Sequence, residues 1–159
     1  MSIKFTEKVI INCSPEEAFD YTQDYQHRLQ WDTFLKKAEL IDGATQVGKG
    51  VRAYCVAHNG LGMVTEYVSF NRPKSTAIKM IKGPFLFKRF LGSWTFKEVG
   101  NAQTEVVFLY LLSLRFPFSL VTRLVSNRLQ HNVRNRLFDL KTSIENHSIV
   151  MHAADTSQA

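Results

Sequence analysis

The stretch FSLVTRLVSNRLQHNVRNRLFDLKTSIEN, residues 118–146, decides the fold. It contains no Gly or Pro, and its apolar residues recur at the spacing of one face of an α-helix. These residues are Val121, Val125, Leu129, Val133, Leu137, Leu140 and Ile144. The pattern predicts a helix of about 29 residues, roughly 43 Å long, with one buried face. After Glu145 we expect a frayed tail.

The chain between Thr33 and Leu114 alternates with a period of two, which is typical of strands. Turn signals such as Asp42-Gly43 and Asn71-Arg72-Pro73 divide it into six segments. The predicted strands cover residues 34–41, 51–57, 62–70, 76–82, 86–98 and 104–114. Short loops join them in sequence, which favours an antiparallel meander.

A further alternating strand covers residues 3–11 and ends at a helix start, Ser14-Pro15-Glu16-Glu17. The Ser14 hydroxyl can accept a hydrogen bond from the amide of Glu17, and Pro15 fits the first helical position. This helix is predicted to be short, and a second helical turn is expected to run up to Trp31-Asp32. Two short helices therefore separate the first strand from the other six.

The predicted fold class is α+β: a curved seven-stranded antiparallel sheet wrapped around the long C-terminal helix. One helix, about 10 Å across, does not fill the concave side of a strongly curved sheet, so an internal space between helix and sheet is expected. We expect one domain over residues 1–146 and a flexible tail over residues 147–159.

The composition of the chain limits the classes of function that the protein can have. The chain has 159 residues and a net charge of +6, with 20 Lys and Arg against 14 Asp and Glu. The basic residues are spread and no run of five occurs, so a DNA-binding stripe is not indicated. Cys13 and Cys55 do not form a Cys-x-x-Cys motif. No apolar run approaches the roughly 20 residues of a membrane-spanning helix, and no signal peptide is visible, so we expect a cytoplasmic protein.

Together with this order of elements, several short stretches resemble the START-like, helix-grip superfamily, including its polyketide cyclase/dehydratase and lipid-transport group. They are Ile11–Phe19 leading to Trp31, Gly48-x-Gly50, Gly83-Pro84-Phe85, Gly92–Phe96, Thr104–Val106 and Leu140–Glu145. The resemblance covers about residues 2–146. It implies a hydrophobic cavity under the long helix that binds a lipid, sterol, quinone, polyketide or similar apolar ligand.

Charged residues mark the outer face of a half-buried sheet, so their alternate neighbours point inward. Lys97 and Glu105 point outward by this argument. With the residues of the helix, the inward side chains give the predicted ligand-binding set. It comprises Trp31, Cys55, Met63, Tyr67, Met80, Phe90, Trp94, Phe108, Tyr110, Val125, Leu129, Asn132 and Arg136. The same residue types would serve a solid core equally well.

Three polar residues, Arg128, Asn132 and Arg136, edge the buried face of the predicted helix. One or two of them could reach into the cavity and orient a carboxylate, carbonyl or hydroxyl group of a ligand. Alternatively, they form a solvated helix border, or an Arg pairs with Asp139.

The sequence offers little for catalysis. The five histidines lack the spacing of metal ligands, and neither a nucleophile elbow nor a phosphate-binding loop is present, so we expect no metal or cofactor. General acid–base chemistry needs only an Arg, Tyr or His in a dry pocket. The candidates for such a role are Tyr54, His58, Tyr67, Arg89, Tyr110 and Arg136.

The segment Lys82 to Leu91 interleaves aromatic and cationic residues. Such a segment could contact an anionic membrane, although its aromatic residues would equally fit a strand that belongs to the core.

We expect a non-catalytic protein that binds, transports or senses a small hydrophobic ligand in the cavity. One alternative is a cyclase or dehydratase, a lyase or isomerase without metal, in which an Arg or Tyr stabilises an enolate. The other is a quinone-binding protein that associates with membranes or ribosomes. The oligomeric state does not follow from the sequence.

Overall fold

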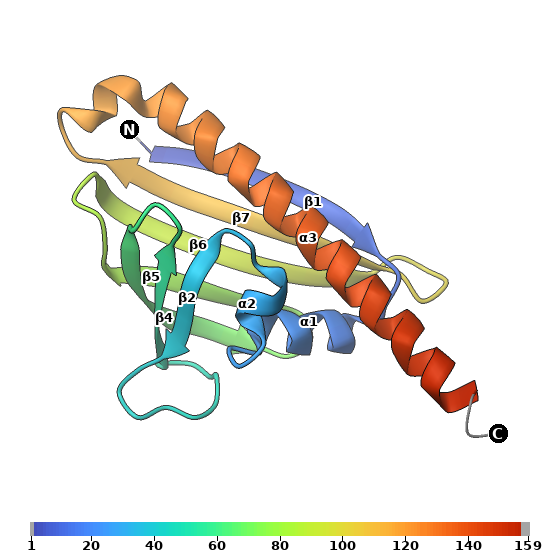
Figure 1. Cartoon of the computed structure of the whole chain (residues 1–159). Coiled ribbons are helices and arrows are strands. Elements are labelled where there is room, and N and C mark those ends of the chain that lie inside the picture. The colour runs from blue at the N-terminus through green and yellow to red at the C-terminus, as the bar shows by residue number, and fades with distance from the viewer. Residues whose placement is uncertain (1, 157–159) are drawn as a thin grey trace.

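The predicted fold is confirmed in a computed structural model, which describes residues 2–156 (Figure 1). Within these residues the chain forms one seven-stranded sheet, three α-helices and a 3-10 helix, η1. The strands are β1 (Ser2–Ile11), β2 (Leu35–Leu40), β3 (Arg52–Ala57), β4 (Gly62–Asn71), β5 (Ser75–Lys82), β6 (Phe87–Glu98) and β7 (Thr104–Leu114). The helices are α1 (Pro15–Gln23), α2 (Arg28–Trp31), η1 (Phe118–Val121) and α3 (Thr122–Thr156).

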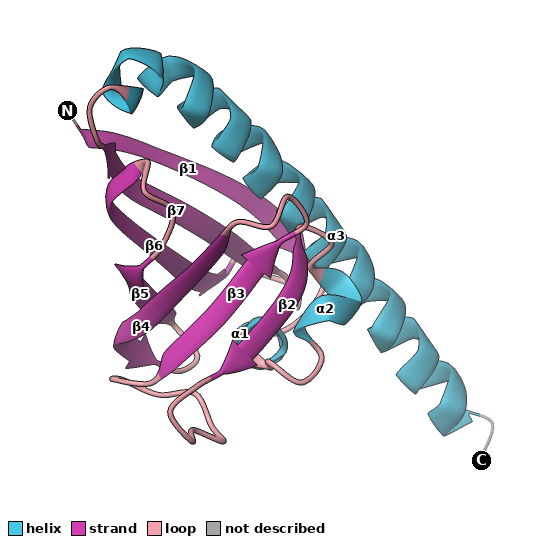
Figure 2. Cartoon of the chain, turned by 60° about the vertical axis from the view of Figure 1, so that its left-hand side comes forward, coloured by secondary structure: helices cyan, strands magenta, loops and turns pink. Residues whose placement is uncertain are grey.

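The sheet is an antiparallel meander with the strand order β1-β7-β6-β5-β4-β3-β2. Strands that follow one another in sequence pair with each other from β2 to β7, and β1 pairs with β7 at the edge. The sheet curves strongly, and α3 lies across its concave side beside β1 (Figure 2). The C-terminal turns of α3 project beyond the sheet.

The antiparallel pairing gives the molecule two ends. At the η1 end lie the start of β1, the β3–β4 turn, the β5–β6 loop, the β7–η1 link and the start of α3; the pairs Ser2↔Ser113 and Phe87↔Leu114 fix this arrangement. At the α1 end lie α1, the β2–β3 loop and the β6–β7 turn (Figure 1). The two ends carry different kinds of side chain.

Local sequence signals set the helix boundaries. As predicted, the Ser14 hydroxyl accepts a hydrogen bond from the amide of Glu17 at 3.1 Å and caps α1. The long helix differs from the prediction at its C-terminus, because α3 continues through Asn146 to Thr156. No Gly or Pro occurs between these residues, so the sequence contains no stop signal there. The predicted division into a domain and a flexible tail stays a prediction, and residues 157–159 lie outside the described part.

The core lies between α3 and the sheet and is rich in aromatic side chains. On α3, the buried apolar residues are Val133, Leu137, Leu140 and Ile144. The inward faces predicted for β6 and β7 are confirmed, because their alternate residues are buried in one cluster, which includes Phe90, Trp94, Phe96, Val106, Phe108 and Tyr110. Trp94 and Phe108 pack edge to face, with ring centroids 4.3 Å apart.

Among residues 2–156, none of the helices is both long and apolar enough to cross a membrane. The same residues contain no group of three His, Cys, Asp or Glu side chains that could hold a metal ion.

Candidate functional site

Two arginines and one aspartate meet in the interior of the fold. Arg136 of α3 donates to both carboxylate oxygens of Asp32, at 3.0 and 2.7 Å. Arg28 of α2 donates to Oδ2 of Asp32 at 2.9 Å. The second terminal nitrogen of Arg136 donates to the Tyr110 hydroxyl of β7 at 3.0 Å. All four residues are buried, and we call them the arginine cluster.

Each member of the arginine cluster is placed by its own element. Arg28 is the first residue of the short helix α2, and Asp32 directly follows its last residue, so the two side chains are four residues apart and reach the same side. Arg136 follows Val133 by three residues and precedes Leu140 by four, which places it within the buried stripe of α3. Folding α3 against α2 therefore brings Arg136 onto Asp32.

The arginine cluster carries more positive than negative charge. Two guanidinium groups share one carboxylate, so the formal charge of the three groups is +1. Burial would raise the pKa of Asp32, but the charges and hydrogen bonds of Arg136 and Arg28 outweigh it and hold this pKa below its ordinary value. Asp32 is therefore ionised at neutral pH, and one buried positive charge has no acidic partner in the cluster.

Aromatic rings flank the two guanidinium groups. The Arg28 guanidinium lies 4.7 Å from the ring centroid of Trp31, and that of Arg136 lies 5.1 Å from the ring of Phe34. The indole Nε1 of Trp31 is buried and has no hydrogen-bond partner among the described residues. A buried donor without an acceptor is unusual in a protein interior and is a group that a bound ligand could satisfy.

Buried hydroxyl and amide groups extend the polar region from Arg28 toward α1. Arg28 also donates to the carbonyl of Thr22 at 2.7 Å. The Tyr67 hydroxyl donates to Gln23 at 2.8 Å and lies 3.2 Å from the Tyr25 hydroxyl. Burial raises the pKa of Tyr67 well above its ordinary value, and it raises that of Tyr110 despite the nearby Arg136. Both phenols are therefore neutral at physiological pH.

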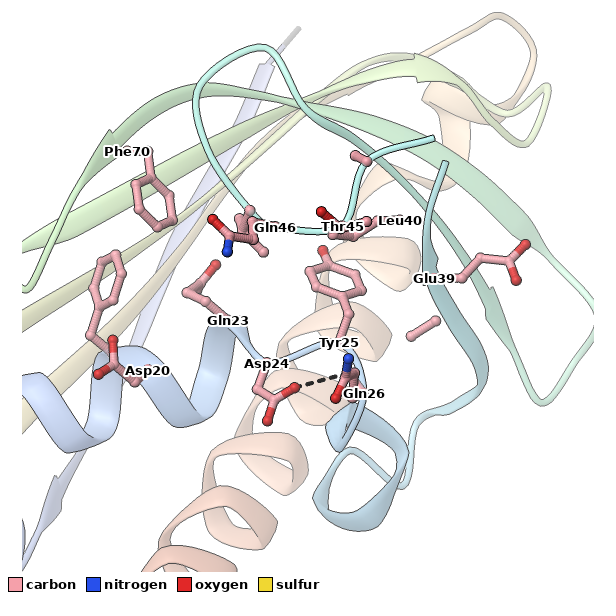
Figure 3. Close-up of a pocket in the computed structure, with 14 residues that line it drawn as sticks. Asp20, Gln23, Asp24, Tyr25, Gln26, Glu39, Leu40, Thr45, Gln46 and Phe70 are labelled. Carbon is pink, nitrogen blue, oxygen red and sulfur yellow. Dashed lines mark hydrogen bonds between the residues drawn. The ribbon is translucent and has the colours of Figure 1, made fainter. Parts of the chain in front are cut away.

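An open pocket of about 520 Å³ lies outside this polar region, between α1, β2 and the β2–β3 loop (Figure 3). It is lined by Phe19, Asp20, Gln23, Asp24, Tyr25, Gln26, Ala38, Glu39, Leu40, Ala44, Thr45, Gln46, Val47 and Phe70. Gln23 and Tyr25, which contact the buried Tyr67, belong to this lining, so these two residues link the pocket to the polar region. A smaller pocket of about 330 Å³ is lined by residues of the β2–β3 loop together with Arg52 and Glu66.

None of the predicted ligand-binding residues lines either of these two pockets. Those residues fall into two groups by burial. The buried group comprises Trp31, Tyr67, Phe90, Trp94, Phe108, Tyr110 and Arg136. The group of intermediate exposure comprises Cys55, Met63, Met80, Val125, Leu129 and Asn132. The predicted cavity between helix and sheet, and the binding role of these residues, stay predictions.

Arg136 is the member of the predicted polar edge that turns inward. Its partner is Asp32 rather than Asp139, whose carboxylate accepts a hydrogen bond from Thr33. Arg128 is exposed, as expected for a solvated helix border. The sequence analysis did not identify Arg28 and Asp32 as site residues. Two signals could have indicated them: their spacing of four residues, and the need of Arg136, within the apolar stripe of α3, for a buried partner.

Three of the other candidates for acid–base chemistry, Tyr54, His58 and Arg89, form no hydrogen bond with the arginine cluster. His58 and Arg89 are exposed, and the ring of Tyr54 faces Lys37, with 5.3 Å between its centroid and the ammonium nitrogen. In the segment from Lys82 to Leu91, Phe87 and Phe90 are buried core residues, whereas Phe85 is exposed. Phe87 and Phe90 therefore belong to the core, and contact of the exposed part of the segment with a membrane stays a prediction.

Comparison with known proteins identifies this architecture. A model of the family described as polyketide cyclase/dehydrase and lipid transport matches residues 2–145. No curated protein sequence matches the chain.

Several solved structures share the fold. A protein from Thermus thermophilus is 20% identical with a TM-score of 0.78, over 92% of this chain and 99% of its own. The Zhui aromatase/cyclase from a Streptomyces species is 12% identical with a TM-score of 0.78, over 93% and 96% of the two chains. A START superfamily protein from Mycobacterium smegmatis is 12% identical with a TM-score of 0.70, over 87% and 97%. At these identities the likeness concerns the fold alone.

Proposed function

Because the chain belongs to the polyketide cyclase/dehydrase and lipid transport family, we propose that it binds a small hydrophobic ligand between α3 and the sheet. The polar end of this ligand, a carboxylate, enolate or carbonyl oxygen, contacts the arginine cluster. The observation that carries the proposal is the pair of buried arginines, Arg28 and Arg136, that share the single carboxylate of Asp32.

The polar end of the ligand is inferred from charge and from hydrogen-bonding capacity. An unbalanced positive charge in the interior is costly, and a ligand anion would offset that cost. The Tyr110 oxygen accepts from Arg136, so its own hydrogen remains to donate to a ligand oxygen. The unpartnered Nε1 of Trp31 is a second available donor. These groups suit an oxygen-bearing ligand better than a purely hydrocarbon one.

The apolar part of the ligand is inferred from the inward-facing residues of intermediate exposure. Met63, Met80, Val125 and Leu129 pack against the core without being fully covered by it. Burial raises the pKa of the Cys55 thiol, and the charges of Arg28 and Arg136 oppose this shift. A ligand that lies along these side chains would gain about 0.8 kcal/mol for each buried CH₂ group. Methionine side chains adapt readily to the shape of such a ligand.

A pair of fluorescent probes tests this proposal. Parinaric acid carries a carboxylate on an apolar polyene chain, and its methyl ester differs only in lacking the charge. We expect the wild-type protein to bind the acid at least about tenfold more tightly than the ester, as a charge-assisted hydrogen bond allows. Failure to bind either probe would contradict the proposed site, and equal binding of both would contradict the role of the arginine cluster.

Two variants isolate the charge in this experiment. Arg28→Met leaves the bidentate Arg136–Asp32 pair intact and makes the cluster neutral, so the preference for the acid should disappear while binding of the ester persists. Arg128→Met, an exposed residue of the same helix as Arg136, is the matched control and should keep the preference.

A cyclase activity is the second candidate, because the same groups could stabilise an enolate. An aldol ring closure forms a carbon–carbon bond through an enolate and then loses water. The guanidinium groups would balance the negative charge of the enolate, and the neutral Tyr110 hydroxyl could donate a proton. With a poly-β-ketone surrogate, wild-type protein should produce aromatic absorbance and Tyr110→Phe should produce it more slowly while still binding the surrogate. Absence of turnover in the wild type would leave the binding role alone.

A further inference from the structure

The η1 end of the molecule exposes a group of large apolar side chains. Phe116 and Leu120 are each more than three quarters exposed, at 76% and 77%, and Phe85 and Leu124 are both at 71%. With Phe118 and Val121, these residues form what we call the η1-end surface. Exposed apolar groups of this size, gathered at one place, mark an interaction site more often than isolated ones do.

The η1-end surface combines two stretches of chain that are far apart in sequence. The β5–β6 loop contributes Phe85, and the continuous stretch from the β7–η1 link through η1 into α3 contributes the others, from Phe116 to Leu124. The amide of Arg115 donates to the Leu86 carbonyl at 2.8 Å and joins the loop to the link. The rings of Phe85 and Phe118 are 6.4 Å apart, edge to face. The apolar side chains are therefore neighbours in space and form one surface.

The charged residues that accompany these apolar side chains are cations. Residues 82–91 and 114–128, which carry the η1-end surface, contain no Asp or Glu. The exposed basic residues there include Lys82, Lys88, Arg89, Arg115 and Arg123. None of these five makes an ion pair within residues 2–156. By contrast, Arg72 at the α1 end pairs with Asp20 at 2.7 Å.

We propose that the η1-end surface docks on an anionic lipid surface, with its aromatic and aliphatic side chains inserted at the level of the headgroups and its cations on the lipid phosphates. Rings and leucines that project from loop tips and are surrounded by Lys and Arg suit the interface of a bilayer. A second copy of the chain is disfavoured as the occupant, because the same cations would face each other. The docking does not depend on the ligand proposed for the interior.

Vesicle flotation with the full chain tests the docking. We expect the protein to float with vesicles of phosphatidylcholine and phosphatidylserine, not with phosphatidylcholine alone, and to be released by high salt. Phe116→Ser and Leu124→Ser should each weaken the binding at least about tenfold, because each removes an inserted apolar side chain. Arg123→Gln should weaken it about fivefold.

Matched variants control for general effects of exposed residues. Phe138→Ser and Ile149→Ser change exposed apolar residues of α3 outside the η1-end surface, and Lys49→Gln changes an exposed cation of the β2–β3 loop. All three should bind vesicles as the wild type does. Equal losses in these controls, or no flotation with anionic vesicles, would overturn the proposal.

Two further results would show that the partner of the η1-end surface is a protein and not a lipid surface. Self-association that Phe116→Ser and Leu124→Ser abolish, in the absence of vesicle binding, would identify a second copy as the occupant. Binding to an acidic protein that depends on the same residues, again without vesicle binding, would identify a protein partner. Vesicle binding needs no interior ligand, so its failure and the failure of the parinaric acid experiment are distinguishable.

Discussion

Up to Asn146, α3 has a first half, residues 122–134, and a second half, residues 135–146. The two halves share one apolar pattern but lie in different surroundings. In the second half, Leu137 and Leu140 are buried under β1, α1 and α2. In the first half, Leu124 is exposed, and Leu129 is only partly covered. Helical periodicity therefore predicts which face of α3 is apolar, whereas the neighbouring elements decide whether that face packs into the core or stays available to a ligand or a binding partner.

The second half is also held by polar contacts from distant parts of the chain. Lys141 donates to the carbonyl of Ile10 at 2.7 Å, and Glu145 accepts from the amide of Asn12 at 3.1 Å. Tyr21 and Ser143 lie 2.5 Å apart through their hydroxyls. The first half makes fewer such contacts among the described residues: Gln130 donates to Glu7 of β1 at 2.6 Å, and Arg134 lies 2.9 Å from the same carboxylate. We expect the first half to be the one that yields when a ligand enters.

The largest loss of stability should come from removing the negative charge of Asp32, which joins α2 to α3. Asp32→Asn leaves Arg28 and Arg136 buried without a carboxylate, and breaking a buried ion pair in this way costs about 3–5 kcal/mol. Urea unfolding followed by circular dichroism would measure the loss. Asp139→Asn, on a residue of intermediate exposure in α3, is the control and should change the stability little. Similar losses in the two variants would contradict a special role of the arginine cluster.

A pair of leucine substitutions tests the comparison of the two halves directly. The side chain of Leu140 is 0% exposed, so Leu140→Ala should lower the free energy of unfolding by about 2–5 kcal/mol, because a cavity remains in the core. Leu124→Ala, on the exposed face, should stay within about 0.5 kcal/mol of the wild type. Both values follow from urea titrations at one temperature. A large loss for Leu124→Ala would mean that the first half of α3 packs more firmly than its exposure indicates.

The residues changed in these two experiments also illustrate which features of the fold and the site the sequence could predict. The cap at Ser14, the strand boundaries and the inward face of β6 depend on neighbours along the chain, so local patterns indicate them well. The partner of Arg136 lies 104 residues away, and no local pattern identifies it. A charged residue inside an apolar helical stripe does indicate that a buried counter-charge exists somewhere. The exposure of Leu124 likewise depends on how far the sheet extends beneath α3.

The pH dependence of stability should separate Asp32 from the rest of the protein. Its pKa is held below the ordinary value of about 3.9, so below that pH the unfolded chain binds the proton more readily than the folded one. The stability that Asp32 contributes is present above about pH 4 and is lost as the pH falls through the folded pKa. The gap in unfolding free energy between the wild type and Asp32→Asn should therefore narrow in acid. A gap that is independent of pH would contradict the assignment.

The smallest change in stability is expected when a surface ion pair is removed that has the same N–O distance as the buried pair Arg28–Asp32. Arg134 and Glu7 lie 2.9 Å apart, as do Arg28 and Asp32, but the Arg134 side chain is 61% exposed. Water and salt screen an exposed pair, and holding two long side chains in place has an entropic cost. Arg134→Gln should leave the urea midpoint unchanged at both low and high salt, in contrast to Asp32→Asn. A salt-dependent loss in Arg134→Gln would show that this contact fixes α3 on β1, and that the two halves of the helix are held more alike than their burial indicates.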